Sequence, residues 1–176
     1  MRHQRVQEPF NLPELPVEHL NFQSASEYAC AKMLEKYTDW QGIDGITCQI
    51  KVGRTIFDFR VDNTFVEYHP VSLKREFLTD GMHHISSAIH NLPKQKKVEI
   101  LKAVATELEA QYAKRRGQIL SVHPIYKDMP LLCVHTPEDF IRKVICQFAT
   151  VRHGDVELMR REFNKLRKEF IALRQI

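Results

Sequence analysis

The sequence predicts a mixed α/β protein, and three observations carry that prediction. Between residues 47 and 69 apolar and polar side chains alternate, as strands require, and two tight turns interrupt the run. Residues 25–37 and 93–116 instead repeat apolar side chains every three or four positions, which is typical of helices. A second, shorter strand signal at 131–135 follows the longer helix. Strands interleaved with helices in this way favour a sheet that has helices packed on it.

The stretch 47–69 is expected to form three antiparallel strands. Glycine first at 53–54 suits a type II′ turn, and the Asp-Asn pair at 62–63 suits a type I′ turn. Two-residue loops fix the register of the strands. In that register Gln49 lies opposite Asp58, and Asp58 lies opposite Glu67.

This register predicts one apolar and one polar face for the three strands. The apolar face would hold Cys48, Ile50, Val52, Phe57, Phe59, Val61, Val66 and Tyr68. The polar face would hold Gln49, Lys51, Asp58, Arg60, Glu67 and His69. Like charges on directly opposed strand positions are destabilising unless something compensates them. Either a bound cation or the neighbouring Arg60 and Lys51 could compensate Asp58 and Glu67, and the register alone leaves both open.

The remaining elements are predicted from capping signals and periodicity. Ser24 is followed three residues later by Glu27, which makes a capping box for helix 25–37, so Glu27 can cap the helix, serve a site, or do both. Helix 93–116, whose apolar stripe includes Tyr112, is expected to end at Gly117. Lys114, Arg115 and Arg116 in its last turn can interact with the helix dipole or contact phosphates, and both remain open. The other predicted elements are a short helix at 80–90, strands at 118–125 and 131–135, a helix at 137–150 and a last helix from 155.

Length and composition fit one globular domain in a reducing compartment. The 176 residues are 43% hydrophobic and 27% charged, without the apolar run of a bilayer span or a signal peptide. The four cysteines are widely spaced and predict neither disulfides nor zinc, so we expect a cytoplasmic or other reducing intracellular location without a membrane. A net charge of +4 permits a nucleic-acid partner. The chain has no Ser-nucleophile elbow and no phosphate-binding glycine loop.

The polar residues of the three strands resemble the PD-(D/E)XK nuclease superfamily. The resemblance lies in an acid in the second strand, Asp58, a Glu-x-His pair in the third, Glu67 and His69, and a preceding helix that bears Glu27. Two positions depart from the family pattern: Phe57 replaces the proline, and histidine stands where lysine is usual. Some branches of the family are similar in using histidine or glutamine there.

This resemblance implies a fold for about residues 24–148. The implied fold is a restriction-endonuclease-like αβββαβ core with a mixed central sheet, to which this chain adds a C-terminal helical extension. We therefore expect an N-terminal arm at 1–23, a nuclease-like α/β domain at 24–150 and a C-terminal helix at 151–176.

The resemblance also implies an activity, namely Mg²⁺-dependent hydrolysis of phosphodiester bonds in DNA by a homing, restriction or repair type of endonuclease. Mn²⁺ is expected to substitute for Mg²⁺. Asp58 and Glu67 would ligate the metal, and His69 or Lys51 would position or deprotonate the attacking water. The candidate site residues are Glu27, Gln49, Lys51, Asp58, Glu67 and His69. The alternative is a nuclease-like module that binds nucleic acid or protein without cutting.

The C-terminal helix carries a heptad-like seam. Its a and d positions are Val156, Met159, Phe163, Leu166, Phe170 and Leu173. Acids at the g positions precede arginines at the e positions by five residues, the spacing that joins two parallel helices. The pattern predicts a homodimer through this helix, with packing of the seam onto the protein's own domain as the alternative.

Overall fold

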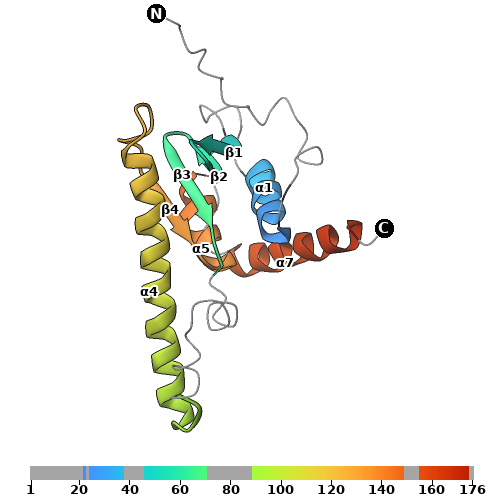
Figure 1. The fold of residues 1–176 in the computed structure, drawn as a ribbon. Coiled ribbons are helices and arrows are strands. Elements are labelled where there is room, and N and C mark those ends of the chain that lie inside the picture. The colour runs from blue at the N-terminus through green and yellow to red at the C-terminus, as the bar shows by residue number, and fades with distance from the viewer. Residues whose placement is uncertain (1–21, 23, 38–45, 71–88, 149–154, 175–176) are drawn as a thin grey trace, which may run out of the picture.

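Residues 22, 24–37, 46–70, 89–148 and 155–174 are described in a computed structural model of the chain. The elements are α1 (Ala25–Tyr37), β1 (Ile46–Val52), β2 (Thr55–Val61), β3 (Thr64–Tyr68), α4 (Lys94–Ser121), β4 (Leu131–Val134), α5 (Pro137–Phe140), the π-helical turn η3 (Ile141–Ile145), α6 (Cys146–Phe148) and α7 (Val156–Leu173). The predicted mixed α/β class is confirmed. In Figure 1 the long helix α4 lies on one side of the sheet, and α1 lies on the other.

The sheet has four strands in the order β1-β2-β3-β4. The first three form an antiparallel meander in the predicted register, since Val52 pairs with Thr55 and Val61 pairs with Thr64. Strand β4 runs parallel to β3, a direction that needs the crossover supplied by α4. Strand β3 therefore lies inside the sheet, between β2 and β4. Its Phe65 amide donates a 2.9 Å hydrogen bond to the carbonyl of Pro130, just before β4.

The two turns of the meander each have a residue with positive φ at their first central position. Gly53 has φ +62°, as the predicted type II′ turn requires. Asp62 has φ +51°, but Asn63 is not among the described residues with positive φ, so the type I′ prediction is wrong at its second position.

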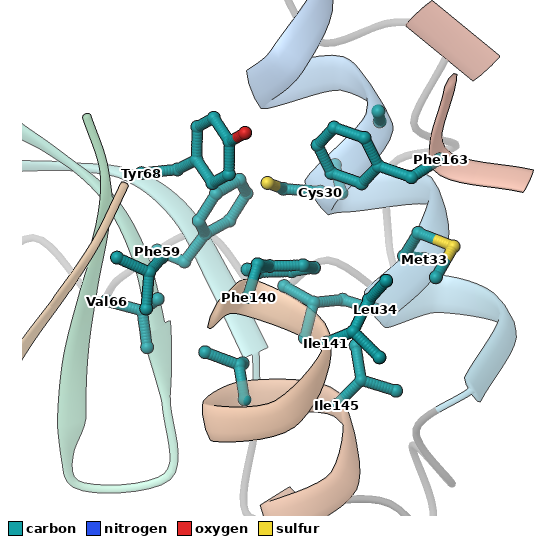
Figure 2. Packing of buried hydrophobic residues seen from close by; sticks show 14 of the residues in the cluster. Cys30, Met33, Leu34, Phe59, Val66, Tyr68, Phe140, Ile141, Ile145 and Phe163 are labelled. Atoms are coloured by element: carbon teal, nitrogen blue, oxygen red, sulfur yellow. The ribbon is translucent and has the colours of Figure 1, made fainter. Parts of the chain in front are cut away.

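The larger core lies between the sheet and the helices α1, α5, η3 and α7 (Figure 2). Figure 2 shows side chains from all of these elements converging, among them Cys30, Met33, Leu34, Phe59, Val66, Tyr68, Phe140, Ile141, Ile145 and Phe163. Each large apolar side chain buried in this way stabilises the fold by about 1.5–3 kcal/mol. The core fixes β3 against α1, and both elements supply residues to the site described below.

The predicted single apolar face of the meander is wrong in part, because it is divided between two cores. Cys48 and Phe59 lie in the larger core, whereas Ile50 and Phe57 lie in a smaller one with Val52, Phe65 and Leu120 of α4. Cys48 and Ile50 are two residues apart on β1, as Phe57 and Phe59 are on β2, so each of these pairs would share a face in a regular strand. The division falls at Gln49 and Asp58, which are both candidate site residues.

Helix α4 continues past the predicted end at Gly117. The residues predicted as a strand at 118–125 instead form its last turn and the turns that follow, and only the strand at 131–134 is confirmed. The reason is tertiary packing, since Leu120 is 2% exposed in the smaller core and Ile119 packs against that core. Gly117 is therefore an interior helix residue, at a cost that this packing offsets.

The seam of α7 packs within the chain. Val156, Met159 and Phe163 are buried in the larger core, and the Phe170 ring stacks on Tyr28 of α1 at 5.0 Å between centroids. The charged positions also bond internally, since the carboxylate of Glu162 accepts hydrogen bonds from two side chains at the end of α1. The homodimer predicted through this seam therefore has no support, because the protein's own domain covers all of its positions except Leu173, which is exposed.

The predicted N-terminal caps of α1 and α5 are confirmed. Ser24 Oγ accepts a 3.1 Å hydrogen bond from the Glu27 amide, and Thr136 Oγ1 accepts one from the Asp139 amide at 3.1 Å. The Glu27 carboxylate in turn accepts a 3.1 Å hydrogen bond from the Ser24 hydroxyl.

Several predictions fall on residues outside the described ranges. These are the arm at 1–23 apart from Phe22, which is buried, and the helix at 80–90 apart from its last two residues. None of the helices in the described ranges combines the length and apolar character needed to cross a lipid bilayer.

Candidate functional site

A polar cavity of about 480 Å³ opens where the start of α1, the splayed ends of β2 and β3, and the C-terminal half of α4 meet. It is lined by Ser24, Ser26, Glu27, Gln49, Ile56, Asp58, Tyr68, His69, Pro70, Tyr112 and Arg116. Four of the six predicted site residues thus share one cavity: Glu27, Gln49, Asp58 and His69. Another concavity, of about 520 Å³, is lined only by residues of the first turns of α4 and has no acid pair.

The two predicted metal ligands interlock across neighbouring strands. The backbone pairing of β2 with β3 includes Phe59 and Val66. At the next positions, the side-chain carboxylates of Asp58 and Glu67 accept hydrogen bonds from backbone amides of the neighbouring strand. Asp58 Oδ2 accepts from the Tyr68 amide at 2.8 Å, and Glu67 Oε1 accepts from the Asp58 amide at 3.3 Å. The predicted juxtaposition of these acids therefore exists, and each carboxylate binds the backbone beside the other.

Glu67 lies behind the cavity wall and has no exposed surface. Its Oε2 accepts a 2.7 Å hydrogen bond from the Tyr112 hydroxyl and a 2.9 Å ion pair from Arg116 Nη2. The compensating arginine is therefore Arg116 of α4 and not the predicted Arg60, whose Nε is buried without a hydrogen-bond partner in the described structure.

The sequence pattern places Tyr112 in the packing stripe of its helix and leaves Arg116 open between the helix dipole and a phosphate contact, so neither residue was among the candidate site residues. A signal was present, because the two residues are four apart and therefore share a helix face. Arg116 continues the inward stripe that includes Tyr112, which favours a partner inside the protein. What the sequence could not supply was the identity of that partner on β3.

Burial and mutual repulsion change the ionisation of the acid pair. Burial, followed by the negative charge of Glu67, raises the pKa of Asp58 to about 8. Burial also raises the pKa of Glu67, although the hydrogen bond from Tyr112 and the charge of Arg116 oppose that rise. Because the pKa of Asp58 is about 8, this carboxyl keeps its proton at pH 7, while Arg116 forms its ion pair with Glu67.

Gln49 adopts an unusual backbone conformation at the cavity. Its φ is +54°, in the left-handed region, although it lies within β1 between the pairs formed by Cys48 and Ile50. A non-glycine residue in this region costs about 1–3 kcal/mol and is frequent at functional sites. The distortion breaks the alternation of β1, and Gln49 lines the cavity beside Asp58.

His69 lines the cavity together with Tyr112 and Arg116 of α4. Its ring stacks on Tyr112 with 3.8 Å between centroids and 4° between planes, and its carbonyl lies 2.7 Å from His135 Nδ1. Lys51 is exposed on β1, pairs with Ile56 and does not line the cavity, so the structure separates it from the other candidates.

The donor set fits a divalent cation that keeps most of its waters. In the described parts of the chain no group of three or more His, Cys, Asp or Glu side chains is arranged to hold a metal. Mg²⁺, however, is commonly held by one or two carboxylates and water. Asp58 Oδ1 has no hydrogen bond from a described residue, and Glu67 Oε1 has only the long one from the Asp58 amide. Asp58 would hold the ion directly, with Glu67 beside it.

Comparisons with known proteins add no assignment to this geometry. No protein-family model matches the chain, and searches of curated proteins and of solved structures gave no significant match.

Proposed function

We propose that this protein is a Mg²⁺-dependent endonuclease that hydrolyses phosphodiester bonds in DNA. The observation that carries the proposal is the interlocked acid pair Asp58 and Glu67 at a polar cavity, with Glu27 and His69 in the same cavity wall. Burying two adjacent carboxylates is unfavourable unless a cation compensates them or one of them keeps a proton, as Asp58 does at pH 7. A single arginine compensates only one of them.

Each residue has a role in this proposal. Asp58 binds the cation. Glu67 holds the Asp58 backbone through the hydrogen bond from the Asp58 amide, and its Oε1 lies beside the ion. His69, held flat against Tyr112, positions or deprotonates the attacking water, and Gln49 orients that water. Glu27 completes the outer shell from α1. A bound Mg²⁺ supplies a water of lowered pKa and stabilises charge on the scissile phosphate.

A second candidate function is a nuclease-like module that binds nucleic acid or a partner protein without cutting. The ion pair between Arg116 and Glu67 favours it, because a positive charge already lies where a metal would interact with Glu67. The unengaged oxygen of Asp58 favours the enzyme, since no described cation forms an ion pair with that side chain.

Cleavage assays distinguish the two functions. Purified protein is incubated with supercoiled, linear and branched DNA in Mg²⁺, Mn²⁺ or EDTA. The enzyme proposal predicts cutting of at least one of these substrates with either metal and none in EDTA. Binding of DNA without cutting under all three conditions would favour the binding module.

Metal binding is expected to release a proton from Asp58. Because the pKa of Asp58 is about 8, this side chain is protonated at pH 7 and must ionise to bind the ion. Titration calorimetry with Mn²⁺ in two buffers of different ionisation enthalpy measures the protons released. We expect about one proton at pH 7 and close to none at pH 9.5, with affinity falling about tenfold per pH unit below pH 7. Proton release that does not change with pH would contradict the role given to Asp58.

His69 is expected to affect the rate more than the binding of metal. His69→Ala should slow cleavage by about 10²–10⁴-fold, the usual contribution of a general base, while Mn²⁺ affinity stays within about threefold. His69→Lys should retain part of the activity, since lysine is usual at this place in the family that the sequence resembles. Unchanged cleavage by His69→Ala would remove histidine from the mechanism.

A further inference from the structure

The guanidinium of Arg116 is held from two of its three nitrogens. Nε donates to the Tyr112 hydroxyl at 2.9 Å, and Nη2 donates to Glu67 Oε2 at 2.9 Å and to the Ile56 carbonyl at 3.1 Å. The group also lies over the Phe57 and Tyr112 rings, at 4.9 Å and 5.3 Å from their centroids. Together these contacts fix both the position and the plane of the guanidinium.

The third nitrogen, Nη1, has no hydrogen bond to any residue that the structure describes. Arg116 lines the cavity, and 19% of its side chain remains exposed. Nη1 thus carries two hydrogens without a described acceptor, on a rigid group that lines the same cavity as Asp58 and His69. A charged donor that is fixed in advance binds an anion without the entropy cost of ordering a flexible side chain.

We propose that Arg116 binds a phosphate oxygen of the nucleic-acid substrate through Nη1, and that Glu67 and Tyr112 are the residues that position it. The inference rests on the proposed function, because the cavity's ligand is then a phosphodiester. Arginine suits the role, since a guanidinium donates to phosphate oxygens in a fixed plane and stays charged at any pH of interest.

A counter-ion for Glu67 alone would need only the contact from Nη2. The bonds to Tyr112 and Ile56 orient the group further, and Nη1 remains unengaged on a residue that lines the cavity. The acids Glu27 and Asp58 share that cavity, so a phosphate also needs a cation near them. Binding is therefore to be measured both in EDTA and in Ca²⁺.

The test is the affinity for a fluorescein-labelled 20-mer DNA, single-stranded and duplex, measured by fluorescence anisotropy. Arg116→Met alone leaves Glu67 buried and unpaired, and such a variant can fail to fold. The test therefore compares Glu67→Gln with the double variant Glu67→Gln/Arg116→Met, which differ only at position 116. Arg115→Met is the matched control, because Arg115 is the exposed neighbour on the same helix and carries the same charge.

The double variant is expected to bind the DNA about tenfold more weakly than Glu67→Gln in both EDTA and Ca²⁺. Its slope of log affinity against log salt should fall by about one, as expected for the loss of one phosphate contact. Arg115→Met should stay within about twofold of wild type.

The outcomes separate this inference from the proposed activity. Weaker binding by the double variant, from a wild type that cuts no DNA, would support the phosphate contact and reject the nuclease. Equal affinities of Glu67→Gln and the double variant, from a wild type that does cut, would make Arg116 a structural counter-ion and overturn the inference. An equal loss in Arg115→Met would overturn it too, as would a wild type that binds neither DNA.

Discussion

Asp58→Asn is expected to abolish metal-dependent cleavage, by about 10³-fold or more, and at the same time to stabilise the protein at high pH. The folded protein holds the pKa of Asp58 at about 8, against an ordinary value of 3.8. Between these values the folded state keeps a proton that the unfolded state releases. Stability from this group is thus complete below about pH 4 and is lost as pH rises to about 8.

Asparagine cannot ionise, so the variant avoids that loss. We expect urea denaturation to show it more stable than wild type by about 2–4 kcal/mol at pH 9, with a difference near zero at pH 4. The matched control is Asp128→Asn, an exposed acid in the turn before β4, which should change neither stability nor cleavage. A variant Asp58→Asn that is less stable than wild type at pH 9 would show that the ionised carboxylate holds the strands together.

Phe163→Glu is expected to unfold the protein. Phe163 has no exposed surface, and its ring lies 5.6 Å from the Tyr68 ring and 6.1 Å from the Phe140 ring. Loss of a buried phenylalanine costs about 3–5 kcal/mol, and a buried unpaired carboxylate adds to that cost. Together they match a large part of the stability of a typical domain.

The control on the same helix is Leu158→Glu, because Leu158 is 64% exposed. Circular dichroism and urea denaturation should show Leu158→Glu folded with near wild-type stability, and Phe163→Glu unfolded or close to it. Had the seam of α7 joined two copies of the chain, Phe163→Glu would instead give a folded monomer. Recovery of such a monomer by analytical ultracentrifugation would contradict the packing of α7 in its own core.

The parts of the fold that local chemistry dictates could be predicted from the sequence. The meander register follows from two-residue loops, and the first residues of α1 and α5 follow from their capping side chains. The same register brings Asp58 and Glu67 together without reference to any tertiary contact. These features depend on neighbours a few residues apart, so a short stretch of sequence contains their cause.

The rest depends on contacts between distant residues, which patterns along the chain do not record. Gly117 looked like a helix end, but packing of Leu120 against Phe65 and its neighbours extends α4 through it. The ion pair between Arg116 and Glu67 joins residues 49 positions apart. The left-handed conformation of Gln49, which turns β1 from one core to the other, has no signature in a residue type that strands accept.

The seam of α7 also depends on contacts between distant residues. Its heptad spacing correctly predicted an apolar stripe, but spacing cannot distinguish a second copy of the helix from the surface of α1. Only the three-dimensional position of Tyr28 and of the end of α1 decides that Phe170 and Glu162 bind within the chain.

The central claim is that Asp58 holds a divalent cation in the polar cavity, and locating Mn²⁺ tests it most directly. Crystals grown at pH 8.5, where Asp58 can ionise, are soaked in Mn²⁺, and anomalous difference density is measured for wild type and for Asp58→Asn. We predict a peak bonded to Asp58 beside Glu67 in wild type, and no peak there in the variant. An empty cavity in wild type, or a peak that persists in Asp58→Asn, would contradict the claim.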